Sequence, residues 1–319
     1  KLGGQAVKTY SSDPPAAYPS AWEGQLYYNS SDGQFKFQTL GAGAWSSGGA
    51  LPTATNNQAA FGTQTAALSA GGYIPPGPTP NVQTYDGSSW TEVNNLGTSR
   101  YGPRGCGTTT AGLVMGGIPP VTGKTEEFDG TNWTESGDLN TSRYALAGAG
   151  TQTAGLAVGG DVNSPITAVT EKYDGSSWTE TGDLNTARKG LMSAGTQTAA
   201  IAAGGASPSD TVNVETFDGS SWTEIANLNS ARNNIAGSTA GSTTATLAFG
   251  GHESSVTAKT EEWNGSSWTE VGDLGTARGD LGGAGTTTAA LAIGGEEPSR
   301  STKTEEWTVS HTLKKVTTS

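Results

Sequence analysis

The stretch YDGSSWTE, residues 85–92, occurs five times in the chain with little change. The other copies are FDGTNWTE from residue 128, YDGSSWTE from 173, FDGSSWTE from 217 and WNGSSWTE from 263. Asp-Gly or Asn-Gly between β-forming residues is the strongest short-range signal for a β-hairpin, because glycine accepts the positive φ that a tight turn needs. The phrase therefore predicts a corner between two antiparallel strands. We interpret it as a structural joint and not as five copies of an active site.

Each corner belongs to a longer repeat. Gly-Gly pairs stand at 71–72, 116–117, 159–160, 204–205, 250–251 and 294–295. Tryptophans run in step with them, 43 to 46 residues apart, at Trp45, Trp90, Trp133, Trp178, Trp222 and Trp268. Each unit is expected to contain four short strands, because β-forming residues alternate with small or polar ones and turns recur every ~8–12 residues. Six such units arranged radially predict an all-β, six-bladed β-propeller.

The repeat region does not begin and end at the same point of the repeat unit. The last unit contains Gly294-Gly295 and a third strand, STKTEEW, but TVSHTLKKVTTS replaces its corner. A matching fourth strand occurs at the other end of the chain, where Trp45 and Leu51 have the repeat spacing. We predict that residues near 43–49 supply the outer strand of the sixth blade. This arrangement closes the ring and removes an exposed sheet edge.

A pair of charged residues also recurs. Arginine follows the repeat leucine by four residues, at Arg100, Arg143, Arg188, Arg232 and Arg278. Glutamate precedes the third-strand aromatic residue by two, at Glu126, Glu171, Glu215, Glu261 and Glu305. In the first unit both charges are absent, and Thr55 and Gln83 stand there instead. Because a half-buried charge without a partner is costly, this joint loss favours Arg–Glu pairs inside the blades over an anion-binding ring around a central channel.

These features resemble the kelch repeat over about 260 residues of the chain. The shared features are Gly-Gly after the second strand, an aromatic residue in the third, a tryptophan in the fourth and an arginine before the next first strand. The resemblance implies a propeller of six or seven blades, although the units are shorter than the usual kelch length of about 50 residues. It implies little about activity, because function depends on the sites that a fold carries.

Composition limits the classes of function. The 319 residues carry a net charge of −12, which argues against nucleic acid or an anionic membrane surface as a partner. No apolar run reaches the ~18 residues of a membrane span. The single cysteine, Cys106, is expected to be a small buried residue. The two histidines, His252 and His311, lack the spacing of metal ligands, and no nucleophile elbow or phosphate-binding loop occurs. We therefore predict no metal, cofactor or catalytic residue, although paired carboxylates for glycoside hydrolysis stay open among the 29 acidic residues.

The segments after Gly-Gly differ from unit to unit. In a propeller these loops between second and third strands project from one face, beside the loops that connect successive blades. A rigid scaffold with divergent loops is the usual arrangement of a recognition surface, although drift in unconstrained loops is the alternative for any one residue. The candidate ligand-binding residues are Tyr73, Asp161, Asp210, His252, Glu253, Glu296 and Arg300.

Residues 1–44 lie outside the repeats and form a predicted first domain, followed by the propeller over residues 45–319. The stretch SAWEGQLYYNSSDGQFKFQ, residues 20–38, predicts a hairpin around Ser-Asp-Gly. The polar arm before it is too poor in apolar residues to fold alone, so we expect it to become ordered on another subunit. The phrase EGQLYYNSSDGQFKF and the near-identical Thr-, Ala- and Gly-rich units are similar to tail-fibre and appendage proteins of marine, cyanophage-type bacteriophages.

That resemblance implies a non-enzymatic virion protein on the surface of an extracellular particle. Residues 1–44 would hold it to other virion proteins in a multi-copy assembly. The propeller would present a face to a host-surface glycan or a neighbouring subunit, and many copies would raise the avidity of weak contacts. A secreted carbohydrate-active enzyme on a propeller scaffold and a bacterial surface or filament protein are the alternatives.

Overall fold

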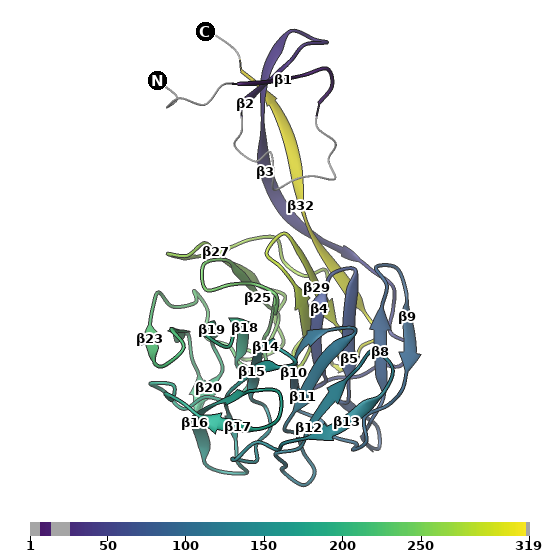
Figure 1. Ribbon diagram of the computed structural model, residues 1–319, viewed down its shortest axis with the longest axis vertical. Coiled ribbons are helices and arrows are strands. Elements are labelled where there is room, and N and C mark those ends of the chain that lie inside the picture. The colour runs from purple at the N-terminus through teal and green to yellow at the C-terminus, as the bar shows by residue number, and fades with distance from the viewer. Residues whose placement is uncertain (1–6, 14–25, 317–319) are drawn as a thin grey trace. The chain divides into compact units, whose positions relative to one another are not determined.

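The computed structural model describes residues 7–13 and 26–316, and this part of the chain consists of strands, turns and loops without a helix (Figure 1). It forms two units. The larger unit is Trp45–Trp307, and the smaller one combines residues up to Ala44 with those from Thr308 on. The C-terminal residues thus group with the N-terminal ones and not with the propeller predicted over 45–319. The reason is that no Asp-Gly corner follows Trp307, so the last strand continues.

Five four-stranded antiparallel sheets follow one another along the larger unit, and we number them in chain order. The first contains β4 (Ala59–Thr63), β5 (Ala66–Ala70), β8 (Val82–Tyr85) and β9 (Trp90–Val93). The second contains β10 (Arg104–Thr108), β11 (Ala111–Met115), β12 (Thr125–Phe128) and β13 (Trp133–Ser136). The third contains β14 (Ala147–Thr151), β15 (Ala154–Asp161), β16 (Ile166–Tyr173) and β17 (Trp178–Glu180).

The fourth sheet contains β18 (Met192–Thr196), β19 (Ala199–Ala203), β22 (Val214–Phe217) and β23 (Trp222–Glu224). The fifth contains β24 (Ala236–Gly237), β25 (Thr246–Phe249), β26 (Thr260–Trp263) and β27 (Trp268–Glu270). The loops between second and third strands add the two-residue pairs β6–β7 (Tyr73–Ile74, Gly77–Pro78), β20–β21 (Ala206–Ser207, Ser209–Asp210) and β30–β31 (Glu296–Glu297, Ser299–Arg300). Four strands per repeat unit are confirmed, and the architecture is all-β and propeller-like.

A sixth sheet joins the two ends of the repeat region. This sheet has six strands. Four of them are β28 (Gly282–Gly285), β29 (Ala289–Ile293), β32 (Thr304–Lys315) and β3 (Gln34–Ser47), and β3 lies next to β32. The Gly48 N–H donates to Thr304 O at 2.9 Å, and the Leu51 N–H donates to Thr302 O at 2.8 Å. The Trp45 and Trp307 ring centroids lie 5.5 Å apart. The strand predicted near residues 43–49 therefore pairs with the third strand of the last unit.

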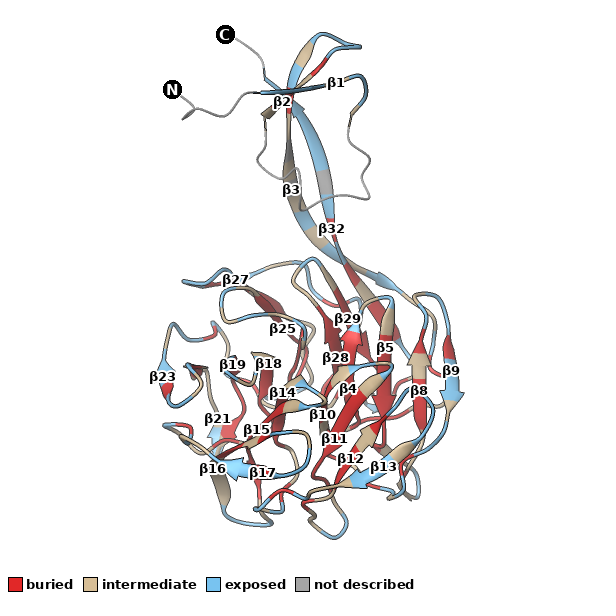
Figure 2. Cartoon of the chain, in the orientation of Figure 1, coloured by how far each residue is buried: buried red, intermediate tan, exposed pale blue. Residues whose placement is uncertain are grey.

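Burial decreases from the inner to the outer strands of each sheet. Figure 2 shows β11 and β14 largely buried, whereas β17 and β23 are largely exposed. Small residues are needed inside because neighbouring sheets approach closely. A Cβ placed on Gly155 of β15 would lie 2.7 Å from Leu113 Cδ2 in the second sheet. The Ala- and Gly-rich inner strands thus follow from packing between sheets.

Each repeated corner packs its two aromatic rings together. In the third sheet the Tyr173 and Trp178 ring centroids lie 5.0 Å apart. The backbone N–H groups of Ser176 and Ser177 donate to Asp174 Oδ1 at 2.9 and 2.8 Å, and these bonds, with others from the same serines, lower the pKa of Asp174 to about 2. The aspartate is occupied by its own turn, as a structural joint requires.

The remaining two strands of the sixth sheet, β1 (Lys8–Tyr10) and β2 (Leu26–Asn29), belong to the smaller unit. β2 pairs antiparallel with β3, which confirms the hairpin around Ser-Asp-Gly. β1 pairs in parallel with β2, so part of the predicted arm is ordered within its own chain. Asp13 accepts hydrogen bonds from Tyr27, Asn29 and Lys36 at 2.9, 2.6 and 2.8 Å. The rest of the arm, residues 1–6 and 14–25, lies outside the described residues.

Candidate functional site

The five repeated arginines lie in the interior, and their side chains are 0% exposed. In each pair Nη2 lies 2.8–3.1 Å from a glutamate Oε1, and the pairs are Arg100–Glu126, Arg143–Glu171, Arg188–Glu215, Arg232–Glu261 and Arg278–Glu305. Glu215 Oε2 also accepts the backbone N–H of Asn185 at 2.8 Å, and Arg188 Nη1 donates to Asn213 O at 2.6 Å. The predicted Arg–Glu pairing is confirmed. These arginines are structural and do not form an anion-binding ring.

Each of the six sheets has a residue with a positive φ, between 47° and 67°, at the same place in the repeat. This residue stands two positions after the arginine position. The six residues are Asn57, Gly102, Ala145, Gly190, Asn234 and Asp280. Backbone N–H groups connect them in sequence: Gly102 donates to Asn57 O, Ala145 to Gly102 O and Gly190 to Ala145 O, at 2.8–2.9 Å.

The remaining connections run through the last sheets. Asp280 donates to Asn234 O at 3.2 Å, and a Cβ on Gly190 would lie 3.0 Å from Asn234 N. The Asn57 N–H donates to Asp280 O at 2.8 Å, which links the first sheet to the sixth. The loops that precede the first strand of each of the six sheets therefore meet at one place.

These loops surround a polar cavity of about 410 Å³, which we call the cup. Its volume lies within the ~300–1,000 Å³ of small-molecule sites. The partly exposed polar and aromatic side chains that line it are those of Asn57, Tyr101, Tyr144, Lys189, Asp210, Asn233, Asn234 and Asp280. Phenol rings, amides, an ammonium group and carboxylates together can stack on a polar ligand and hydrogen-bond to it.

Asp161 does not line the cup, but it contacts two residues that do. Its side chain is buried, its Oδ2 lies 2.6 Å from Lys189 Nζ, and the Tyr144 hydroxyl donates to the same oxygen at 3.3 Å. Burial alone would raise the pKa of Asp161, but hydrogen bonds from Lys189 and the Ser164 N–H lower it overall. Asp161 therefore positions Lys189 and Tyr144, which face the cavity.

Asp210 and His252 also lie at the cup, whereas Glu253 does not. Asp210 lines it directly and accepts a hydrogen bond from Asn233 Nδ2. His252 Nε2 lies 3.1 Å from Asp280 Oδ2, and this hydrogen bond raises the pKa of His252. Glu253 is engaged elsewhere, because its Oε1 lies 2.8 Å from Lys259 Nζ.

The other three sequence candidates, Tyr73, Glu296 and Arg300, form a cluster with Asn56. Asn56 Nδ2 donates to Glu296 Oε2 at 2.7 Å, and Arg300 Nε donates to Asn56 Oδ1 at 3.1 Å. The Arg300 guanidinium lies 4.5 Å from the Tyr73 ring centroid, and the Tyr73 ring meets the edge of Tyr101 at 5.6 Å. Tyr101 lines the cup, so this cluster supports one of its walls.

Sequence reasoning missed the cup residues Tyr101, Tyr144, Lys189 and Asn233. They stand directly after the repeat arginine, in SRYG, SRYA, ARKG and ARNN. Each forms a β-bridge with the first residue after a Gly-Gly pair, for example Tyr144 with Asp161. The available signal was that this one position varies among Asn, Tyr, Lys and Gly, while the residue before it is arginine in five of the six units.

Other sequence expectations can be placed as well. Cys106 is buried, as expected of a small core residue, and burial raises the pKa of its thiol to about 12. The His311 side chain lies outside what the structure describes. Within residues 7–13 and 26–316, no cluster of three or more His, Cys, Asp or Glu side chains could hold a metal ion. The same residues include no helix able to cross a bilayer.

Comparison with known proteins identifies the fold only. No family model and no curated protein matches the chain. Among the solved structures that match is one titled "Structure of YjhT", with 14% sequence identity and a TM-score of 0.69. The match covers 84% of this chain and 100% of that chain. The larger unit therefore shares a propeller-like fold with that structure, and identity this low carries no function across.

Proposed function

We propose that the protein is a non-enzymatic adhesion protein of a bacteriophage particle whose cup binds a host-surface glycan. The observation that carries this proposal is the cup itself, a cavity of about 410 Å³ lined by Tyr101, Tyr144, Lys189, Asp210 and Asn233. Sugars present hydroxyl groups and apolar ring faces. Amide and carboxylate groups can hydrogen-bond to the hydroxyl groups, and tyrosine rings can pack on the apolar ring faces.

The scaffold we propose is a closed six-bladed propeller of kelch type. Two observations support closure. Strand β3, from the start of the chain, pairs with β32, from its end. The positive-φ residues also connect the sixth sheet back to the first through the Asn57–Asp280 hydrogen bond of 2.8 Å. Closure would hold the cup rigid before a ligand arrives, and a preformed site loses less entropy on binding.

A neutral glycan suits the cup better than a strongly charged ligand. Lys189 is paired with Asp161, Asp210 accepts from Asn233, and Asp280 contacts His252. Each of these charged groups already has a partner in the protein. They therefore offer a ligand hydrogen bonds more than net charge. Single contacts of this kind are weak, and many copies on one particle would provide avidity.

The smaller unit is proposed to attach the chain to other virion proteins. Within the described residues, the large hydrophobic side chains that are most exposed all belong to it: Val7, Phe35, Leu313 and Val316, 37–46% exposed. Apolar side chains exposed together mark interaction surfaces in soluble proteins. Detection of the chain in purified phage particles tests this placement and separates it from a bacterial surface or filament protein.

Binding can be tested with the full chain displayed on multivalent beads against a glycan array. We expect a defined set of neutral glycans to bind and Tyr144→Ala to lose at least ~10-fold in affinity, about 1.4 kcal/mol. Phe35→Ala is the matched control, because it removes an exposed aromatic ring of the smaller unit and should leave binding unchanged. No binding across the array, or equal binding by Tyr144→Ala, would reject the proposal.

A carbohydrate-active enzyme is the second candidate, because two carboxylates, Asp210 and Asp280, line the same cup. Incubating each bound glycan with the protein and measuring new reducing ends distinguishes the two. We expect no product. Hydrolysis that disappears in Asp210→Asn while glycan binding persists would favour the enzyme.

A further inference from the structure

One position on the first strands breaks the symmetry of the repeat. It lies two residues after the positive-φ residue, and its occupants in chain order are Ala59, Arg104, Ala147, Met192, Ala236 and Gly282. Five sheets thus form with an uncharged residue at this position. An arginine is therefore not required to build the second sheet, and the fold alone does not explain Arg104.

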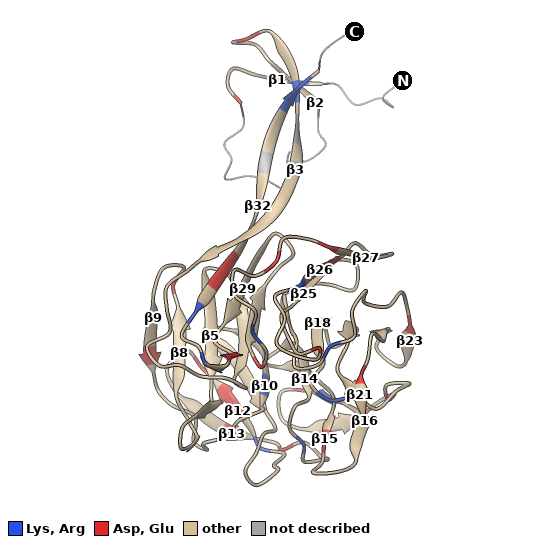
Figure 3. Ribbon diagram, turned by 180° about the vertical axis from the view of Figure 1, so that it is seen from behind, with Lys and Arg blue, Asp and Glu red and all other residues tan. Residues whose placement is uncertain are grey.

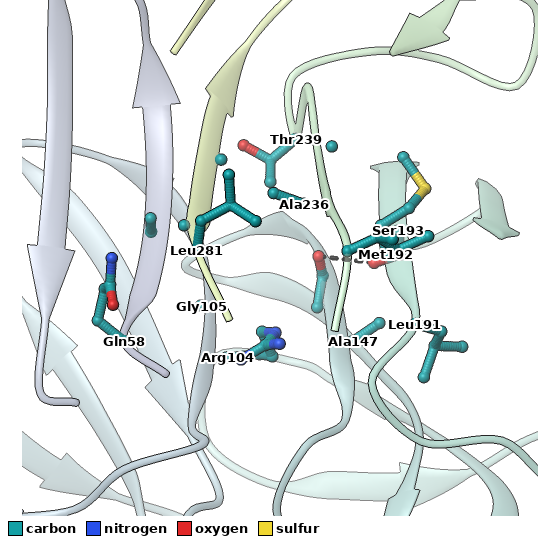
Figure 4. Close-up of a pocket in the computed structure, with 16 residues that line it drawn as sticks. Gln58, Arg104, Gly105, Ala147, Leu191, Met192, Ser193, Ala236, Thr239 and Leu281 are labelled. Atoms are coloured by element: carbon teal, nitrogen blue, oxygen red, sulfur yellow. Dashed lines mark hydrogen bonds between the residues drawn. The ribbon is translucent and has the colours of Figure 1, made fainter. Parts of the chain in front are cut away.

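Arg104 lines a narrow cavity enclosed by residues from the first strands and the segments leading into them. All six sheets contribute, with side chains such as Gln58, Ser193, Thr239 and Leu281. Figure 4 shows Arg104 among these residues, and Figure 3 shows basic residues beside β10, the strand that Arg104 begins. The cavity volume is about 30 Å³. A water molecule needs ~10–15 Å³ measured in this way, so the space suits one or two very small species and no sugar.

The guanidinium of Arg104 has no carboxylate partner. Its one hydrogen bond in the described part of the chain runs from Nη1 to Pro103 O, at 3.0 Å, and it takes part in no ion pair there. Asp280 acts on Arg104 only from beyond ion-pair distance. The five repeat arginines each have a glutamate at 3.1 Å or closer. Arg104 is partly exposed, and a cation without a carboxylate partner beside it can attract a counter-ion into the cavity.

We propose that the cavity beside Arg104 binds a single small monovalent anion of the halide class. The guanidinium provides the charge and N–H donors. The Thr239 Oγ1 atom is also buried without a hydrogen-bond partner in the described residues, and it lies across the cavity from Arg104 (Figure 4). The apolar remainder of the lining, such as Leu281 and Ala147, disfavours a second charge. This site is separate from glycan binding and does not depend on it.

The first measurement is thermal unfolding of the full chain in chloride or gluconate at constant ionic strength. An ion that binds the native state raises the Tm by mass action. We expect the Tm to rise with chloride and this dependence to vanish in Arg104→Ala, a variant expected to fold because alanine occupies the equivalent position in three other sheets. Arg300→Ala, which removes a cation that stacks on Tyr73, is the matched control and should keep the chloride dependence.

The second measurement is anomalous diffraction from crystals of the full chain grown in bromide. We expect a bromide peak in contact with the Arg104 guanidinium, and none in Arg104→Ala. Water alone beside Arg104, or equal chloride dependence in wild type and Arg104→Ala, would overturn the proposal. Sulfate at the same place, displacing bromide, would overturn the halide class.

Discussion

A single hydroxyl decides whether a corner tryptophan satisfies its indole N–H. Trp178 Nε1 donates to Thr125 Oγ1 of the preceding sheet at 2.9 Å. Trp268 Nε1 is buried and has no partner in the described residues. The residue equivalent to Thr125 on the sheet preceding Trp268 is Val214, which has no oxygen to offer. The sequence repeat could not reveal this contact, because its two residues stand 53 positions apart in different units.

Replacing Val214 with threonine should therefore stabilise the protein. A buried hydrogen bond contributes about 0.5–1.5 kcal/mol net, and threonine fits this position in four other sheets. Urea unfolding of Val214→Thr measures the gain. The matched control is Thr170→Val, which orphans Trp222 Nε1, now 3.0 Å from the Thr170 hydroxyl. Thr170→Val should lower the free energy of unfolding by about 1–3 kcal/mol. A higher free energy of unfolding in this control would contradict the stabilising role of the Trp–Thr hydrogen bond.

The buried ion pairs lead to a second prediction. Arg188→Thr should leave the Glu215 carboxylate buried without its cation and cost about 3–5 kcal/mol in unfolding free energy. The double variant Arg188→Thr, Glu215→Gln copies the Thr55 and Gln83 of the first sheet and should lose less than the single one. Additive losses in a double-mutant cycle would show that the two groups do not interact. This pairing could be predicted from sequence because both charges are missing together in one unit.

His252 should make stability depend on pH. Its hydrogen bond to Asp280 raises its pKa in the folded state, and Glu296 and Asp210 act in the same direction. A raised folded pKa means that this stabilisation is present below the unfolded value of about 6.5 and is lost as the pH rises through the folded value. Comparing the Tm of wild type and His252→Gln across that range checks the sign. If the Tm of the wild type rose relative to that of His252→Gln as the pH increased, the predicted sign would be wrong.

At the scale of strands and corners, local chemistry made most of the structure predictable. Asp-Gly corners and alternating small and β-forming residues were enough to predict four strands per unit. The three-residue strand β1 was not predictable, since KTY carries no periodic signal and pairs in parallel with β2. The length of β32, Thr304–Lys315, results from the missing corner after Trp307. The cup was missed because its residues come from loops of separate units.

Strand β3 gives a test at this scale. Deleting residues 1–50 removes β3 and leaves the Thr304–Trp307 part of β32 as an unpaired edge. Unpaired edges promote association. We expect the truncated chain to form oligomers in analytical ultracentrifugation and to have a lower Tm. Deleting residues 1–25 is the control, because it retains β3, and a monomeric 1–50 deletion with wild-type Tm would contradict the role of this strand.

At the scale of the whole molecule, the proposed glycan cup and anion cavity both depend on six sheets surrounding one axis. The repeat period predicted the number of units, and the phase offset between the chain ends predicted which strands would meet. The connection of positive-φ residues through Asn57 and Asp280 had no signal in the sequence, because Asn, Gly, Ala and Asp all occur there. It depends on backbone groups that every residue type provides.

Amide hydrogen exchange at Gly48 and Leu51 tests this architecture most directly. Their N–H groups donate to Thr304 O and Thr302 O, so they report whether the start of the chain is bonded to its end. A closed ring predicts that both amides exchange with the same opening free energy as core amides such as that of Ile201, through global unfolding. Exchange of both amides at the rate of exposed loops would contradict closure.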